Sequence, residues 1–212
     1  AGVDPNEEVI CRGSIKVGSQ VYRCWKKSGH GRMNMRTALY HSCNTYFYKM
    51  GRDATIDNIH SVANTLGFGE KTGVELPGEL AGINPSRRWK EMHYNSSWLI
   101  GDTVNHSIGQ GYNLVTPMQL AVMMSRISSG FKIKPSLYKN SSKIEKLDIP
   151  EKHLNIIRDH MNGVFNNKNG TGYNLRITED QYKLAGKSGT AQVVFDEKIQ
   201  KSAAIAYFEA FV

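Results

Sequence analysis

Four adjacent residues, Lys187, Ser188, Gly189 and Thr190, place an ammonium group beside two hydroxyl groups. The β-branched and aromatic residues at positions 193–195 predict a strand that continues from them. Small residues at the start of such a strand let another backbone approach closely and pair with it. The hydroxyl and ammonium groups favour an anionic or carbonyl-bearing partner. An ordinary strand that begins at a turn is the alternative interpretation.

Ser42 and Asn44 form a second polar pair, in a segment whose apolar residues recur at helical spacing. Asn34 can cap this predicted helix, and Gly51 lies near its end. Serine and asparagine are poor residues for a helix interior because their side chains compete for backbone hydrogen bonds. Either the two side chains are merely exposed, or they face a cleft.

The chain has three cysteines, Cys11, Cys24 and Cys43, and His30 lies between the last two. Thiolate and imidazole groups are the preferred ligands of tetrahedral zinc, and a structural site uses four of them. A Cys11–Cys24 disulfide across a hairpin is a second interpretation, suited to an oxidising compartment. Three buried free thiols are a third interpretation. The spacing alone leaves all three open.

The 212 residues are 40% hydrophobic and 22% charged, which is typical of one globular domain or two small ones. The formal net charge of +8 suits an anionic polymer or membrane surface. However, the basic residues are dispersed and form no known nucleic-acid-binding module, so we do not expect nucleic-acid binding. The chain has neither a long apolar run nor a secretory signal, and we expect it to be a piece of a longer protein.

Turn residues and hydrophobic periodicity predict an α+β fold. We expect a hairpin of residues 9–17 and 19–25 that turns at Gly18. Thr116, Gln119 and Pro117 predict the start of a well-capped helix that Gly130 ends. The other predicted helices span residues 56–66 and 149–165, and further strands span residues 131–138 and 203–212.

Ser-x-Asn on a helix and Lys-Ser-Gly-Thr on a strand are two of the three elements found in serine enzymes that open peptide and β-lactam carbonyls. Such chemistry needs a proton relay, a group that holds the substrate amide and donors for the oxyanion. Ser42 and Lys187 would form the relay, and Asn44 would bind the amide. Ser188 and Thr190 would hold a carboxylate, and the backbone at Thr190 would face the oxyanion.

The chain resembles the transpeptidase domain of class B penicillin-binding proteins, most closely the penicillin-binding protein 2 branch. Four segments carry the resemblance in family order: residues 24–31 with Gly-His-Gly, residues 38–48 with Ser-Cys-Asn, residues 108–119 with Gly-Gln-Gly and Thr-Pro-Met-Gln, and residues 185–193 with Lys-Ser-Gly-Thr. The resemblance implies an antiparallel sheet flanked by helices, with a helical subdomain that carries Ser42. It also implies that Ser42 and Asn44 form the second family motif, and that Lys187, Ser188, Gly189 and Thr190 form the third.

The resemblance also favours zinc, because some members of this branch carry a metal site that maps onto Cys11, Cys24, His30 and Cys43. The role implied for the metal is structural. Other implied properties are D,D-transpeptidase activity on peptidoglycan stem peptides, acylation by β-lactams, a location at the periplasmic face of the inner membrane, and partners in the cell-elongation complex, including a glycan polymerase. No nucleic acid is implied.

One family element is missing, because no Ser-x-x-Lys motif, which supplies the nucleophile, precedes Ser42. The letters fit Ser129 with Lys132 and Ser136 with Lys139, but both lie after Ser-x-Asn and neither lies on one helical face. We therefore expect residues 1–212 to be a partial domain, truncated at both ends, that cannot form an acyl-enzyme by itself. A D,D-carboxypeptidase, a serine β-lactamase and a non-catalytic peptidoglycan-binding module are the alternatives.

Overall fold

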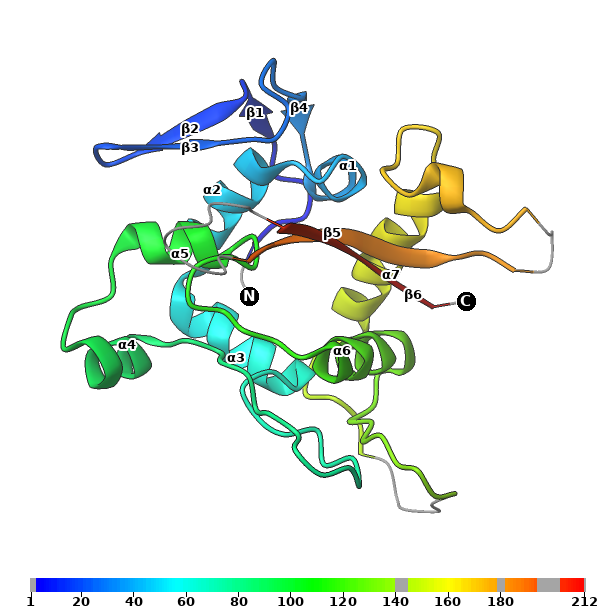
Figure 1. Cartoon of the computed structure of the whole chain (residues 1–212). Helices are drawn as coiled ribbons and strands as arrows, with labels where there is room; N and C mark the ends of the chain where they lie inside the picture. The colour runs from blue at the N-terminus through cyan, green and yellow to red at the C-terminus, as the bar shows by residue number, and fades with distance from the viewer. Residues whose placement is uncertain (1–2, 140–144, 179–181, 194–202, 212) are drawn as a thin grey trace.

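The computed structural model describes residues 3–139, 145–178, 182–193 and 203–211. It mixes helices with strands, as predicted, and the described strands form three antiparallel pairs. The longest pair, β5 (Ala185–Val193) and β6 (Ala203–Phe211), crosses the centre of the molecule in Figure 1. The register sets Ala185 opposite Phe211 and Val193 opposite Ala203. Positions 194, 195 and 212 of the predicted strands lie outside the described residues.

Helices α6 (Pro117–Ser129) and α7 (Glu151–Asn166) pack beside this strand pair and were both predicted from the sequence. The predicted capping box of α6 is present, because Thr116 Oγ1 accepts the Gln119 N–H at 3.1 Å and Gln119 Oε1 accepts the Thr116 N–H at 2.9 Å. Gly130 ends α6 in a left-handed conformation. Buried side chains of α6, α7 and β5 form a shared core, which contains Met124, Ile127, Met161 and Ala185.

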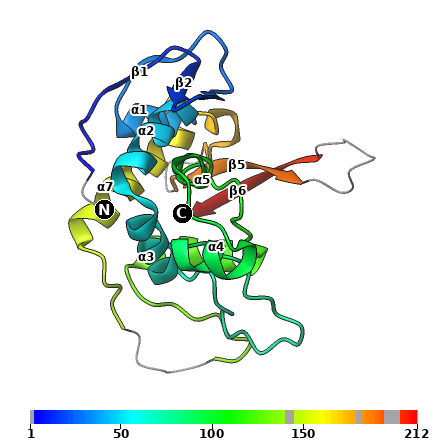
Figure 2. The same ribbon diagram turned by 90° about the vertical axis from the view of Figure 1, so that its left-hand side faces the viewer.

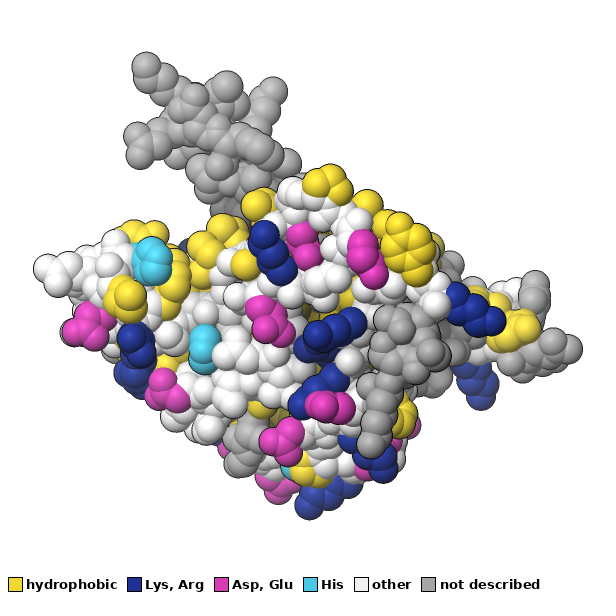
Figure 3. Space-filling model, turned by 90° about the horizontal axis from the view of Figure 1, so that it is seen from below, with side chains coloured by type: hydrophobic (Ala, Val, Ile, Leu, Met, Phe, Trp, Pro, Cys, Tyr) yellow, Lys and Arg dark blue, Asp and Glu magenta, His cyan; other side chains and the backbone are white. Residues whose placement is uncertain are grey.

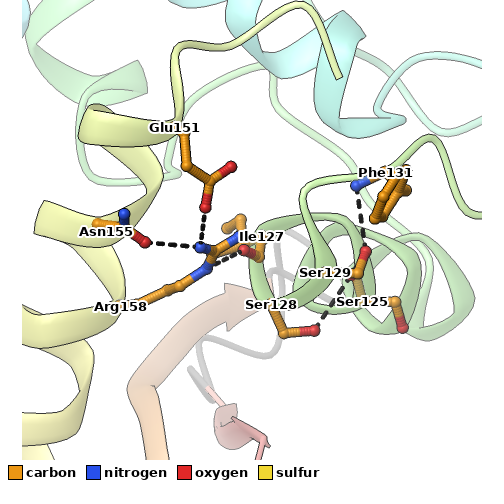
Figure 4. Close-up of polar contacts among 8 residues, drawn as sticks. All are labelled: Ser125, Ile127, Ser128, Ser129, Phe131, Glu151, Asn155 and Arg158. Carbon is orange, nitrogen blue, oxygen red and sulfur yellow. Dashed lines mark hydrogen bonds and ion pairs between the residues drawn. The ribbon is translucent and has the colours of Figure 1, made fainter. Parts of the chain in front are cut away.

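Arg158, in the middle of α7, forms hydrogen bonds with the end of α6 and with the first residue of its own helix, Glu151 (Figure 4). Arg158 Nε donates to the Ile127 carbonyl oxygen at 2.7 Å, and Nη1 donates to Asn155 Oδ1 at 2.8 Å and to Glu151 Oε1 at 2.5 Å. The guanidinium group thereby satisfies a carbonyl in the last turn of α6 that has no partner within the helix. This contact fixes the two helices that support β5.

The N-terminal strands differ from the predicted two-stranded hairpin. β2 (Ser14–Val17) pairs with β3 (Gln20–Arg23) around Gly18 as predicted, but β1 (Val9–Cys11) pairs with β4 (Gly31–Met33) instead of continuing into β2. The break lies at Gly13, which has a φ of +88° and where a Cβ would lie 2.1 Å from the Lys27 carbonyl oxygen. Only glycine tolerates both conditions.

The single helix predicted around Ser42 is two helices, α1 (Met35–Tyr40) and α2 (Asn44–Ala54). Ser42 has a φ of 51°, in the left-handed region, so it lies in the connection and not on a helix. Asn34 caps α1 as predicted, since its Oδ1 accepts the Thr37 N–H at 3.0 Å. Figure 2 shows α1, α2 and α7 on the same side of the β5–β6 pair.

Helix α3 (Ile56–Leu66) has the predicted bounds and ends at Gly67 in the left-handed conformation. Helices α4 (Arg87–Tyr94) and α5 (Ile100–His106) and the short 3-10 helix η1 (Tyr173–Leu175) were not predicted, since their apolar residues show no clear period. The strand predicted at residues 131–138 is wrong. There, Phe131 forms only an isolated bridge with Lys146.

The surface carries charges of both signs. Figure 3, seen from below, shows acidic and basic side chains interspersed over that face of the described residues. This agrees with the dispersed basic residues of the sequence. Among the described helices, none is both long enough and apolar enough to cross a bilayer.

Candidate active site and cysteine–histidine cluster

Lys187 and Ser42, 145 positions apart in the sequence, meet in the structure. The Lys187 Nζ donates to Ser42 Oγ at 2.6 Å, and it also donates to the Ser188 carbonyl oxygen at 2.6 Å. β5 supplies the lysine, and the connection between α1 and α2 supplies the serine. The predicted contact between the two motifs is therefore present.

Burial lowers the pKa of Lys187 to about 8, because desolvation disfavours the ammonium form. A lysine with such a pKa exchanges a proton near neutral pH more readily than an exposed lysine. Since Ser42 Oγ accepts from Nζ, its own O–H is free to donate to a third group. The pair can thus pass a proton from Lys187 through Ser42 to a leaving group.

Asn44 is the first residue of α2 and lies two positions after Ser42 in the sequence. Its Nδ2 is 3.5 Å from the Arg23 carbonyl oxygen, and the residue is partly exposed. This weak contact leaves most of the amide's hydrogen-bonding capacity available to a ligand.

Ser188 and Gly189 follow Lys187 along β5 and are accessible to solvent. Ser188 Oγ lies 3.4 Å from Lys187 Nζ and 3.0 Å from Thr171 Oγ1. Thr190 is opposite Ala206 in the β5–β6 register, and its side chain lies outside the described part of the chain.

Cys11, Cys24, His30 and Cys43 form a cluster whose ligand atoms all lie within 4.8 Å of one another. His30 Nδ1 is 3.6 Å from Cys11 Sγ and 3.5 Å from Cys24 Sγ. Ligands at zinc bond lengths in a tetrahedron are about 3.3–3.8 Å apart, so the two distances from His30 to the cysteines fit the metal. None of the three cysteines is in a disulfide, which argues against the Cys11–Cys24 bridge.

Burial raises the pKa of Cys43 and lowers the pKa of His30. Both shifts favour the uncharged form of the side chain. The cluster lies among apolar residues such as Val9, Met33 and Tyr46, which join β1 and β4 to α2.

Residues 1–212 match the family model of the penicillin-binding protein transpeptidase domain. The chain belongs to this family. It is 36% identical over 185 residues to the peptidoglycan D,D-transpeptidase MrdA of Escherichia coli strain K12, a match that covers 81% of this chain and 29% of that protein. The chain therefore spans less than a third of this relative.

Solved structures of Helicobacter pylori PBP2 have the same fold as this transpeptidase domain. PBP2 alone matches with a TM-score of 0.90 and 35% identity, covering all of this chain and 39% of PBP2. PBP2 in its complex with MreC matches with a TM-score of 0.89 and 35% identity, covering 99% of this chain and 39% of PBP2. The fold predicted from the family resemblance is confirmed.

Two residues of this transpeptidase domain were missed at the sequence level. Trp25 Nε1 donates to the carbonyl oxygens of His41 and Ser42, at 3.0 and 2.9 Å, although the ring is 59% exposed. Thr171 contacts Ser188 from the turn after α7. The position of Trp25 directly after Cys24 was a usable signal in the sequence, whereas the turn around Thr171 carried none.

Proposed function

We propose that this domain is the acyl-transfer domain of a peptidoglycan D,D-transpeptidase, which cross-links stem peptides and is acylated by β-lactams. The observation that carries the proposal is the 2.6 Å hydrogen bond from Lys187 Nζ to Ser42 Oγ in a chain of the transpeptidase family. Both side chains belong to motifs that are far apart in the sequence, and the fold brings them together near the start of β5.

In the proposed reaction, a serine from a Ser-x-x-Lys motif elsewhere in the complete protein attacks the carbonyl carbon of the scissile amide, and the lysine of that motif accepts the proton of the serine hydroxyl. The bond to the leaving nitrogen breaks, and that nitrogen takes the proton of the Ser42 hydroxyl. Lys187 returns a proton from its ammonium group to Ser42 Oγ along the 2.6 Å hydrogen bond. An acceptor amine then attacks the acyl-enzyme, the bond to the serine oxygen breaks, and the proton that the amine loses passes to that oxygen, so the serine hydroxyl is restored.

The remaining side chains would hold the substrate during these steps. Asn44 offers an amide group, with one weak contact to Arg23, to bind the substrate amide. Ser188 offers a hydroxyl group to the terminal carboxylate, and Gly189 keeps the strand accessible to the peptide backbone. Thr190 is proposed to complete the carboxylate and oxyanion contacts.

Labelling with a fluorescent penicillin tests this function in the complete protein that contains this chain. The wild-type protein should be acylated, and Lys187→Ala should lower the acylation rate by at least about 10²-fold, the usual contribution of a positioned acid or base. The 212-residue chain alone should stay unlabelled. Labelling of Lys187→Ala at the wild-type rate would exclude Lys187 from the relay.

We further propose that Cys11, Cys24, His30 and Cys43 bind a structural zinc ion. Their ligand atoms are within 4.8 Å of one another, and Cys43 directly follows Ser42 in the sequence. Bound zinc would cross-link β1, the loop before β4 and the start of α2. Elemental analysis of the purified chain should find one zinc per chain, and a value near zero would contradict the proposal.

The proposed location is the periplasmic face of the bacterial inner membrane, where the peptidoglycan substrate lies. The proposed partners are proteins of the cell-elongation complex, including a glycan polymerase and a protein related to MreC. The support for the latter is the H. pylori complex of PBP2 with MreC. Co-purification of the complete protein with such a partner from a membrane extract tests this assembly.

A further inference from the structure

Thr171 touches both segments that carry the candidate site. Its backbone N–H donates to the carbonyl oxygen of Tyr40, the last residue of α1 and two positions before Ser42, at 3.0 Å. Its Oγ1 lies 3.0 Å from Ser188 Oγ, directly beside Lys187 on β5. One residue therefore connects the Ser42 segment to the Lys187 strand, independently of the Lys187–Ser42 hydrogen bond.

The turn that presents Thr171 is packed tightly against the end of α7. The Gly172 N–H donates to the Val164 carbonyl oxygen at 3.0 Å. A Cβ at Gly170 would lie 2.1 Å from that same oxygen, and a Cβ at Gly172 would lie 2.8 Å from the ring of Phe165. Both neighbouring positions thus need glycine for close approach, and the backbone of Thr171 is held firmly in place.

The Ser188 hydroxyl has a single hydrogen and accepts on its lone pairs. If that hydrogen pointed to Thr171, Ser188 could not donate it to a substrate oxygen. When Thr171 Oγ1 donates instead, the Ser188 hydrogen is free to turn toward the substrate. The Lys187 ammonium, 3.4 Å from Ser188 Oγ, favours the same orientation because it can only donate.

We propose that Thr171 is a positioning residue of the transpeptidase site, which orients the Ser188 hydroxyl toward the substrate carboxylate. This role rests on the proposed function. Thr171 acts through Ser188. The hydrogen bond from the Thr171 N–H to the Tyr40 carbonyl oxygen fixes the position of the Thr171 hydroxyl relative to the Ser42 segment.

The test measures penicillin acylation by the complete protein, separated into a binding constant and a maximal rate. Thr171→Val keeps the shape and the backbone N–H but removes the hydroxyl. The acylation efficiency should fall about two- to tenfold, the usual effect of losing one neutral hydrogen bond, mainly through weaker binding. Thr171→Ser should restore the wild-type efficiency. The pH profile should not move, because Lys187 keeps its contacts with Ser42 and the Ser188 carbonyl.

A double-mutant cycle separates positioning from general stability. In the Ser188→Ala background, Thr171→Val should have no further effect, since the hydroxyl that it orients is gone. Thr65→Val serves as the matched control, because it removes a hydroxyl that donates a hydrogen bond to the Ser61 carbonyl oxygen within α3. This variant should keep the wild-type acylation efficiency. Melting temperatures of all variants check that they fold.

Three results would overturn the proposal: a wild-type efficiency in Thr171→Val, an equal loss in Thr171→Ser, or an undiminished effect of Thr171→Val in the Ser188→Ala background. If the wild-type protein itself is not acylated, the proposed function fails and the role of Thr171 fails with it. A labelled wild-type protein with an unaffected Thr171→Val variant refutes the role of Thr171 alone.

Discussion

The indole Nε1 of Trp25 lies 2.9 Å from the carbonyl oxygen of Ser42 and holds this residue in its left-handed conformation. Trp25 directly follows Cys24, and its ring makes an edge contact with His30 at a centroid distance of 5.1 Å. The cysteine–histidine cluster and the candidate active site therefore share one side chain. A metal bound at the cluster would stabilise the backbone of Ser42 through this contact.

Replacing Trp25 with phenylalanine should keep an aromatic ring at this position but remove the N–H that donates to the carbonyl oxygens of His41 and Ser42. We expect the penicillin acylation rate of the complete protein to fall about two- to tenfold, since one shared hydrogen bond is lost. Trp89→Phe, on α4, is the matched control and should keep the wild-type rate. Equal rates for Trp25→Phe and wild type would show that the indole N–H does not position Ser42.

Ser42 should tolerate glycine better than alanine, because its φ of 51° strains any residue with a Cβ. Both Ser42→Gly and Ser42→Ala remove the hydroxyl group. The glycine variant should nevertheless have a free energy of unfolding about 1 kcal/mol higher than the alanine variant. Urea unfolding of the 212-residue chain measures the difference, and a more stable alanine variant would argue against a left-handed Ser42.

Sequence patterns predicted the helices whose ends carry strong local signals. The capping box of Thr116 and Gln119, with Pro117 and Gly130, fixes α6 through contacts within a few residues. The Lys187–Ser42 contact was predicted because two motifs of known chemistry occur together, although nothing local joins them.

The missed features depend on contacts between distant segments. The break between α1 and α2 needs a left-handed Ser42, and the Trp25 indole that supports it lies on another loop. A single helical period runs through this break, so the pattern predicted one helix. The Thr171–Ser188 contact likewise depends on how the turn after α7 packs, which no short pattern encodes.

Stability should rise with pH in the window where Lys187 loses its proton in the folded state. Burial lowers the pKa of Lys187 from 10.5 to about 8, so between these values the unfolded chain binds more protons than the folded chain. Relative to Lys187→Met, the free energy of unfolding of the wild-type chain should increase by about 1–3 kcal/mol from pH 8 to pH 10.5.

Well below pH 8 the difference in the free energy of unfolding should stay constant, since Lys187 is then protonated in both the folded and the unfolded state. Lys16→Met, which removes a lysine at an exposed position of β2, supplies the control. Urea unfolding at a series of pH values gives the curves. A flat difference across the whole range would mean that Lys187 is not desolvated in the folded chain.

Cys43→Ala should abolish the proposed zinc binding and have a lower melting temperature than the wild-type chain. Cys43 is buried at the start of α2, one residue after Ser42, so a zinc–thiolate bond there would join the N-terminal strands to the site. A chelator should lower the melting temperature of the wild-type chain toward that of Cys43→Ala and leave the variant unchanged. Equal zinc content in the two proteins would remove Cys43 from the ligand set. If the chelator leaves the wild-type melting temperature unchanged, the cluster is stable as three free thiols and a histidine.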